Sequence, residues 1–202
     1  MSNQAKITCT NVWKLFGPDE KRIIKDLVFK STEIKSISLR YFNPIGAHES
    51  ILIGENPLDK PQNLVPMITQ TAIGKYPFLN IYGNDYKTRD GTCIRDYINV
   101  MDLADAHVSA LSKLIKMNSS FYDVYNVGTG KGTSVLEVID LFEKSNNLKL
   151  NYKFSDRRDG DVESAYASCD KINKELNWMA KYSLEDSLIS AWNWECKINS
   201  KN

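Results

Sequence analysis

The 202-residue sequence contains only two histidines, His48 and His107, which lie far apart in the chain. The sequence therefore does not favour a catalytic site that depends on histidine, and no metal site is expected. The four cysteines are also widely separated and form no C-x-x-C pair. This spacing argues against a disulfide scaffold, and it favours reduced thiols in a cytoplasmic protein.

An excess of charge of one sign and long apolar runs are missing as well. The formal net charge is +1, with 26 basic and 25 acidic side chains, so no strong field attracts nucleic acid or a membrane surface. No apolar run approaches the length of a membrane span, and the N-terminus lacks the apolar core of a signal peptide. The composition is that of a globular protein, and 42% hydrophobic residues suffice for a sizeable core.

No dinucleotide-binding unit is recognisable before the first predicted strand. Such a unit begins with a strand, a glycine-rich turn and a helix whose N-terminus holds the pyrophosphate. The spacing of apolar residues instead predicts a helix over residues 18–30 and a strand over residues 37–42. The later glycine-rich segment, residues 128–132, has G-x-G-x-G spacing and no acid at the end of a following strand, which indicates a structural turn.

The strand over residues 37–42 runs into Asn43 and Pro44, where it is expected to close in a turn. Ligands of open α/β sheets bind at the carboxyl ends of the strands, so Asn43 stands where a ligand would lie. Its amide offers a donor and an acceptor and suits a sugar or a uracil ring. On chemistry alone, a strand that simply ends in a turn is the favoured interpretation.

Helix signals follow along the chain. Asn63 is expected to cap one helix, and Asp102 another, which carries His107 as a packing or solvent residue. Ser134 and Glu137 form a capping-box pattern.

Several motifs, taken in order, carry a resemblance to a known family. They are R-Y-F-N-P-I-G-A-H at residues 40–48, N-L at 63–64, D-G-T-C-I-R-D-Y-I-N-V at 90–100 and R-R-D-G-D at 157–161. Together they resemble UDP-galactose (UDP-glucose) 4-epimerases, which are extended short-chain dehydrogenase/reductase proteins. The resemblance implies an α/β fold with a partial NAD(P)-binding Rossmann sheet and a smaller C-terminal UDP-sugar-binding domain.

The same resemblance implies a domain organisation and an activity. Residues 1–48 would be the remnant of the Rossmann domain with its last αβ unit, and residues 49–202 the substrate-binding region, from which residues 97–130 return to the Rossmann sheet. The implied activity is the interconversion of UDP-galactose and UDP-glucose through an NAD-linked 4-keto intermediate. NAD is the implied cofactor, although its phosphate-binding turn is not found in the chain.

The family pattern assigns binding roles residue by residue. The implied substrate-binding residues are Asn43, Asn63, Leu64, Asn80, Ile81, Tyr82, Arg95, Arg158, Asp161 and Ala165, and the implied cofactor-binding residues are Tyr41 and Phe42. Guanidinium groups bind phosphate oxygens in a bidentate manner, and a helix N-terminus favours a diphosphate, so the chemistry agrees with these roles.

Each assignment has a plainer alternative. Tyr82 can be a buried strand aromatic, and Arg95 can pair with Asp96 or another surface acid. Arg158 and Asp161 can belong to a solvated charged loop.

The catalytic pair of the family does not carry over. An ungapped match to its T-N-P-Y-G-x-x-K motif places Trp13 at the tyrosine position and Gly17 at the lysine position. Neither residue can act as a general base, so no catalytic residue is assigned. A catalytically incomplete C-terminal fragment of an epimerase, a non-catalytic UDP-sugar-binding module and one half of a split epimerase all stay open.

The expected ligands are UDP-glucose and UDP-galactose. In the family, a bulky residue at the position of Ala165 excludes N-acetyl sugars, so the small side chain here implies that UDP-N-acetylhexosamines also fit. A homodimer and a complex with an N-terminal half both stay open, and nucleic acid and membranes are not expected partners.

Overall fold

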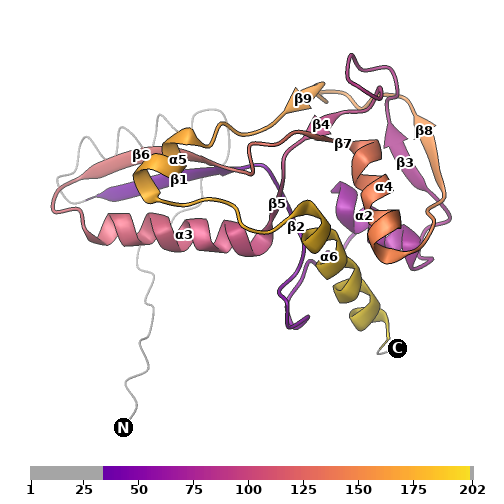
Figure 1. Cartoon of the computed structure of the whole chain (residues 1–202), viewed down its shortest axis with the longest axis horizontal. Coiled ribbons are helices and arrows are strands. Elements are labelled where there is room, and N and C mark those ends of the chain that lie inside the picture. The colour runs from indigo at the N-terminus through magenta and orange to yellow at the C-terminus, as the bar shows by residue number, and fades with distance from the viewer. Residues whose placement is uncertain (1–33, 201–202) are drawn as a thin grey trace, which may run out of the picture.

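The computed structural model describes residues 34–200 of the chain, drawn in colour in Figure 1. The helix expected over residues 18–30 and the positions of Trp13 and Gly17 lie outside the described residues. The strands are β1 (Lys35–Tyr41), β2 (Asn43–Ile45), β3 (Leu79–Tyr82), β4 (Ile94–Arg95), β5 (Tyr97–Asn99), β6 (Phe121–Val127), β7 (Thr133–Ser134), β8 (Tyr152–Ser155) and β9 (Ser164–Ala165). The helices are α2 (Leu64–Ala72), α3 (Val100–Ile115), α4 (Val135–Asn146), α5 (Asp170–Leu176) and α6 (Leu184–Asn199).

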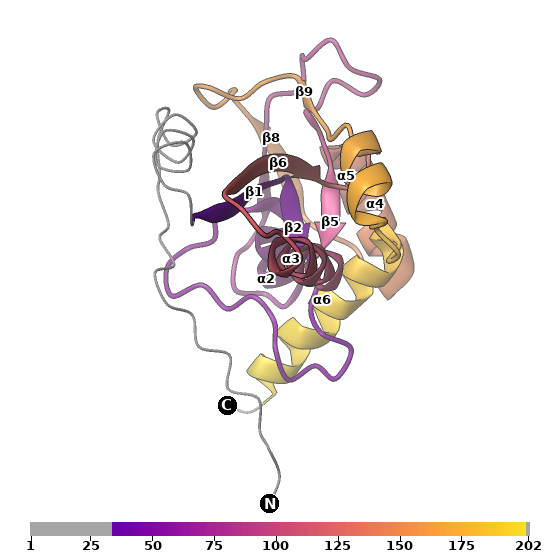
Figure 2. The same cartoon turned by 90° about the vertical axis from the view of Figure 1, so that its left-hand side faces the viewer.

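One end of the molecule is built on the parallel pair of β1 and β6, whose register runs from Lys35 opposite Phe121 to Tyr41 opposite Val127. Helix α3 packs along this pair, and α5 contacts β6 and α3, as the end-on view in Figure 2 shows. The core between these elements contains Tyr125 and Val127, both fully buried. The predicted α/β architecture with parallel strands is therefore confirmed at this end.

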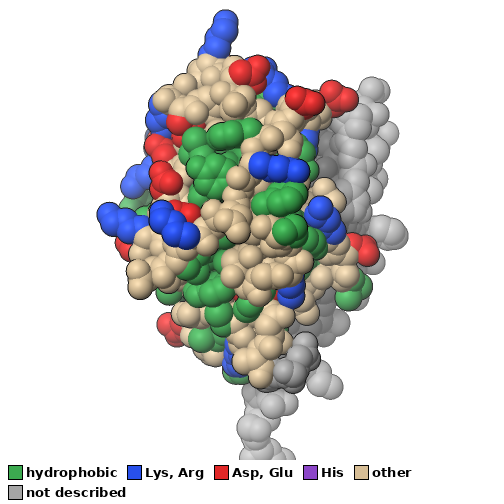
Figure 3. Space-filling model, turned by 90° about the vertical axis from the view of Figure 1, so that its right-hand side faces the viewer, with side chains coloured by type: hydrophobic (Ala, Val, Ile, Leu, Met, Phe, Trp, Pro, Cys, Tyr) green, Lys and Arg blue, Asp and Glu red, His purple; other side chains and the backbone are tan. Residues whose placement is uncertain are grey.

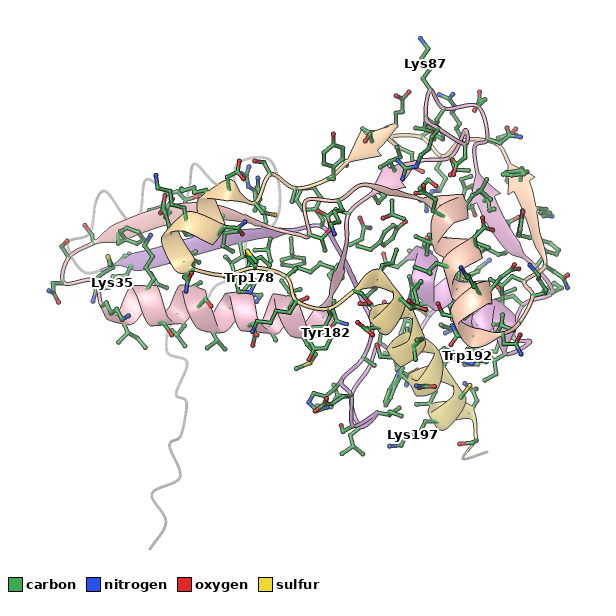
Figure 4. All side chains as sticks on the ribbon, viewed as in Figure 1. Lys35, Lys87, Trp178, Tyr182, Trp192 and Lys197 are labelled. Carbon is green, nitrogen blue, oxygen red and sulfur yellow. The ribbon has the colours of Figure 1, made fainter. Side chains whose placement is uncertain are left out.

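The other end is a second core, in which α2, α4 and α6 pack together with residues of β3, and β3 pairs in parallel with β8. Phe142 of α4 is fully buried and meets Trp192 of α6 edge to face, with ring centroids 5.9 Å apart. Trp192 is labelled beside α4 in Figure 4. Aromatic pairs in this geometry stabilise the packing beyond the area they bury.

The outer side of this second core presents hydrophobic side chains between lysines and arginines (Figure 3). Strand β8 contributes Tyr152 and Phe154, which are both partly exposed and lie edge to face, 6.0 Å apart. Side chains two residues apart point to the same face of a strand, which explains this pair.

Short strands join the two ends. β2 pairs with β5 in parallel, and β4 lies between β7 and β9 in a separate sheet. The turn expected at Asn43 and Pro44 is wrong, because these residues continue as β2. The N–H of Asn43 donates to the Asp96 carbonyl (3.0 Å), so the position of Pro44, which has no N–H, falls on the side of β2 away from β5.

Of the three predicted caps, one is wrong, one is confirmed in its position only and one is confirmed in full. The side chain of Asn99, not Asp102, caps α3 by accepting from the Met101 N–H (2.8 Å). Asn63 stands at the N-cap position of α2 but makes no side-chain cap bond. The capping box of Ser134 and Glu137 at α4 is confirmed, since both of its hydrogen bonds are present.

Candidate functional site

A cavity of about 250 Å³ lies where the N-terminus of α2 meets β2, β3, β4 and the loop after β8. It is lined by Asn43, Lys60, Pro61, Gln62, Asn63, Leu64, Met67, Leu79, Asn80, Ile81, Tyr82, Cys93, Arg95, Tyr97, Val135, Arg158 and Asp161. Nine of the ten residues that the motifs assign to substrate binding are in this set, although they come from distant parts of the sequence. The cavity therefore brings the predicted residues together, and their binding role stays a prediction.

Three of the predicted positions do not line this cavity. Ala165 lies in β9, opposite Arg95 of β4. Tyr41 ends β1, is 47% exposed and stands near the ring of His107, with centroids 6.5 Å apart. Phe42 follows it and donates its N–H to the Val127 carbonyl (3.3 Å). The cofactor roles predicted for Tyr41 and Phe42 stay predictions.

The charged wall of the cavity is organised around Asp161. Arg158 donates from Nε to Oδ2 of Asp161 (3.1 Å), and Nη2 of Arg95 lies 3.5 Å from Oδ1. The guanidinium of Arg158 also covers the ring of Tyr82, 4.8 Å from its centroid. Two arginines thus share one carboxylate, which leaves a surplus of positive charge facing the cavity.

The N-terminus of α2 forms another wall. Because Asn63 makes no side-chain cap bond and the first turn of α2 carries no acid, the positive end of the helix is not neutralised by its own residues. The Asn63 amide instead lies 3.4 Å from the Glu55 carboxylate. Burial raises the pKa of that carboxyl, and the bond from Asn63 lowers it in part. A helix end of this kind favours an anionic ligand.

The polar and apolar walls contain residues that the motifs had not singled out, among them Tyr97, Cys93 and Lys60. Tyr97 follows Arg95 by two residues, so the alternation of a strand could have indicated it. Burial raises the pKa of its hydroxyl far above the usual value, which keeps this group neutral. Lys60 lies in a loop without periodicity, so no local sequence pattern predicts that it lines the cavity.

The glycine-rich turn after β6 has an internal partner. Asp96 is completely buried and accepts from the N–H of Thr129 (2.9 Å), the N–H of Gly130 (3.0 Å) and the N–H of Ala167 (3.1 Å). The turn therefore has a structural role, as the spacing of its glycines indicates: its N–H groups bind the Asp96 carboxylate. A dinucleotide pyrophosphate does not fit there, because the N–H groups already bind a carboxylate.

Within residues 34–200, no group of three His, Cys, Asp or Glu side chains is placed to hold a metal ion. Among the helices of the same part of the chain, none combines the length and the apolar character that crossing a membrane requires.

Comparison with known proteins connects this site to a family. A family model described as GDP-mannose 4,6 dehydratase matches residues 23–190. UDP-glucose 4-epimerase 2 of Arabidopsis thaliana is 48% identical over 196 residues, which make up 96% of this chain and 55% of that protein. UDP-glucose 4-epimerase 1 of Oryza sativa subsp. japonica is 50% identical over 174 residues, or 86% of this chain and 49% of that protein.

Solved structures agree with these relatives. The UDP-glucose-4-epimerase from Stenotrophomonas maltophila, crystallised with NAD and formylated UDP-arabinopyranose, matches with a TM-score of 0.86 and 40% identity over 90% of this chain and 54% of that chain. The UDP-glucose 4-epimerase from Bifidobacterium longum, in complex with NAD+ and UDP, matches with a TM-score of 0.84 and 41% identity, over 90% and 53% of the two chains.

The fold, the cavity and these similarities define an α/β protein of the extended short-chain dehydrogenase/reductase class. Within that class, the chain belongs to the family whose model is described as GDP-mannose 4,6 dehydratase, and it is similar to the C-terminal part of UDP-glucose 4-epimerases. The chain spans about half the length of the relatives it matches.

Proposed function

We propose that this chain is the UDP-sugar-binding part of a UDP-glucose 4-epimerase and that it binds UDP-glucose and UDP-galactose in the cavity. The observation that carries the proposal is the convergence of Asn43, Asn63, Arg95, Arg158 and Asp161 on that one cavity. Four segments, spread over residues 43–161, contribute them. If Arg158 and Asp161 belonged only to a solvated charged loop, they would not be expected to line a cavity together with residues from three other segments.

Each wall of the cavity matches a different part of a uridine diphosphate. The two arginines and the N-terminus of α2 provide positive charge for the diphosphate. The amides of Asn43 and Asn80 and the ring of Tyr82 provide hydrogen bonds and a stacking surface for neutral groups. Asp161 is held by both arginines and can accept from ribose hydroxyls.

The function proposed for residues 34–200 is binding of the UDP-sugar, and it does not include the hydride transfer of the epimerase reaction. NAD supplies hydride transfer in enzymes that use it. The glycine-rich turn at residues 128–130 does not fit its pyrophosphate, since Asp96 occupies the N–H groups. The positions aligned with the family's base and its lysine are Trp13 and Gly17. The expected consequence is that the chain holds the substrate without converting it.

Isothermal titration calorimetry of the chain with UDP tests this proposal. The parent protein is expected to bind UDP, and Arg158→Gln to bind it at least about tenfold more weakly, because a charge-assisted hydrogen bond is lost. Arg40→Gln is the matched control, since Arg40 is exposed on β1 and does not line the cavity.

Two results would overturn the proposal. One is the absence of heat from the parent chain at millimolar UDP. The other is equal weakening by Arg158→Gln and Arg40→Gln, which would indicate non-specific attraction of an anion. Incubation with UDP-glucose and NAD+ adds a separate readout, in which no UDP-galactose is expected to form.

A further inference from the structure

The charges that line the cavity are three cations and one carboxylate. The cations are Lys60, Arg95 and Arg158, and the carboxylate is Asp161, so the net charge is +2. Each phosphate of a diphosphate diester carries about one negative charge. Without Lys60, the net charge of the lining residues would be +1, which is half of the charge that neutralises the two phosphates.

Lys60 differs from the arginines in having no internal carboxylate. Arg95 and Arg158 both lie against Asp161, which occupies part of their donor capacity. Among the described residues, Lys60 forms no ion pair, whereas Lys75, Lys149 and Lys171 each hold an acid. Among the described residues, Lys60 is therefore the cation lining the cavity that is not paired with a carboxylate.

Two features restrict the exposed Lys60. The next residue, Pro61, is buried and lines the cavity, and its ring restricts the backbone. The Lys60 ammonium lies over the ring of Tyr76, 5.3 Å from the centroid. A cation–π contact orients an ammonium without cancelling its charge. Lys60 also precedes α2 by a few residues, so its charge adds to the positive end of that helix.

We infer that Lys60 is a further phosphate-binding residue of this cavity, one that determines affinity for the diphosphate of a uridine nucleotide. This inference rests on the proposed function. It adds a third cation, supplied by the loop before α2, to the two arginines that the motifs indicate. Its contribution is electrostatic, so it weakens as salt screens the charges.

Titration of the 202-residue chain with UDP at low and at moderate salt tests the inference in four proteins: the parent, Lys60→Gln, Lys60→Arg and Lys87→Gln. Lys60→Gln is expected to raise the dissociation constant about fivefold at low salt and to reduce its salt dependence. Lys60→Arg keeps the charge and is expected to retain most of the parent affinity. Lys87 is also an exposed lysine without an ion pair among the described residues, but it lies at a loop tip away from the cavity (Figure 4), so Lys87→Gln is expected to bind as the parent does.

The outcomes separate the inference from the function on which it rests. Parent binding with an unchanged Lys60→Gln overturns the role of Lys60 and leaves the proposed function intact. Equal weakening by Lys60→Gln and Lys87→Gln overturns it as well, because the effect would then come from net charge. Failure of the parent to bind UDP overturns both. Thermal melting of each variant without ligand checks that the fold is unchanged.

Discussion

The Asp96 carboxylate lies 2.9 Å from the backbone N–H of Thr129, at the turn where β6 ends. The hydroxyl of the same threonine donates to Asp96 over 2.6 Å. Asp96 is adjacent in sequence to Arg95, yet successive side chains of an extended segment point to opposite sides. Arg95 therefore faces the cavity while Asp96 faces the turn, and the expected alternative of an Arg95–Asp96 pair is not found.

Replacing Asp96 with asparagine is expected to destabilise the fold. The carboxylate is fully buried and accepts from four donor groups, the N–H and hydroxyl of Thr129 and the N–H groups of Gly130 and Ala167. An amide nitrogen in its place would face N–H donors. We expect Asp96→Asn to lower the free energy of unfolding by about 2–4 kcal/mol, because buried donors lose their acceptor. Urea denaturation measures this change.

The matched control for this change is Asp156→Asn, at an exposed position of the loop after β8. It is expected to change the free energy of unfolding by less than about 0.5 kcal/mol. An Asp96→Asn variant as stable as this control would show that the turn does not depend on the carboxylate.

Ala165 offers a test of which sugars fit. It pairs with Arg95 across β4 and β9, and paired residues of neighbouring strands project to the same face. A tyrosine there would project from the same face as Arg95, next to the cavity that Arg95 lines. We expect Ala165→Tyr to weaken binding of UDP-N-acetylglucosamine by about tenfold and to leave UDP-glucose binding nearly unchanged, as calorimetry can measure.

Ser164→Tyr serves as the control, since Ser164 is the exposed neighbour on the opposite face of β9. It should affect neither ligand. Equal loss of both sugars in Ala165→Tyr would instead mean that the tyrosine disturbs the common diphosphate site, and the assignment of the sugar pocket would be wrong.

Local patterns predicted the elements whose signals are short-range. The strand predicted over residues 37–42 is observed as Lys35–Tyr41, and the capping box at Ser134 is present, because alternation and capping depend on neighbours in sequence. The cap of α3 was mispredicted for a tertiary reason. Asp102 is buried and accepts from the N–H groups of Lys181 and Tyr182 (3.0 and 3.1 Å), so Asn99 takes the capping role.

The site shows the same division between local and long-range information. Asn43 and Arg95 could be predicted from the sequence, because each lies within a sequence motif that resembles the family. The pairing of Arg95 with Asp161 joins residues far apart in sequence, and no local pattern specifies it. Lys60 reaches the cavity through a loop, where the fold rather than any periodicity determines the position.

A cluster of charges around Tyr125 leads to a prediction about pH. The Tyr125 hydroxyl lies 2.7 Å from the carboxylates of both Asp123 and Glu175, and Lys171 also bonds Asp123. Burial alone would raise the pKa of Asp123, but the bonds from Lys171 and Tyr125 outweigh it and hold that pKa below its usual value. A pKa lowered by folding means that the ionised carboxylate stabilises the fold above about pH 4 and that this contribution is lost as the pH falls further.

Asp123→Asn is therefore expected to be destabilised by about 1–2 kcal/mol at pH 7 and to come closer to the stability of the parent at about pH 3, where part of the contribution of the parent carboxylate has been lost. Urea denaturation at the two pH values measures the difference. Asp159→Asn, in an exposed loop, should match the parent at both. A penalty for Asp123→Asn that is the same at both pH values would contradict the argument, because it would arise from shape or from neutral hydrogen bonding rather than from the carboxylate charge.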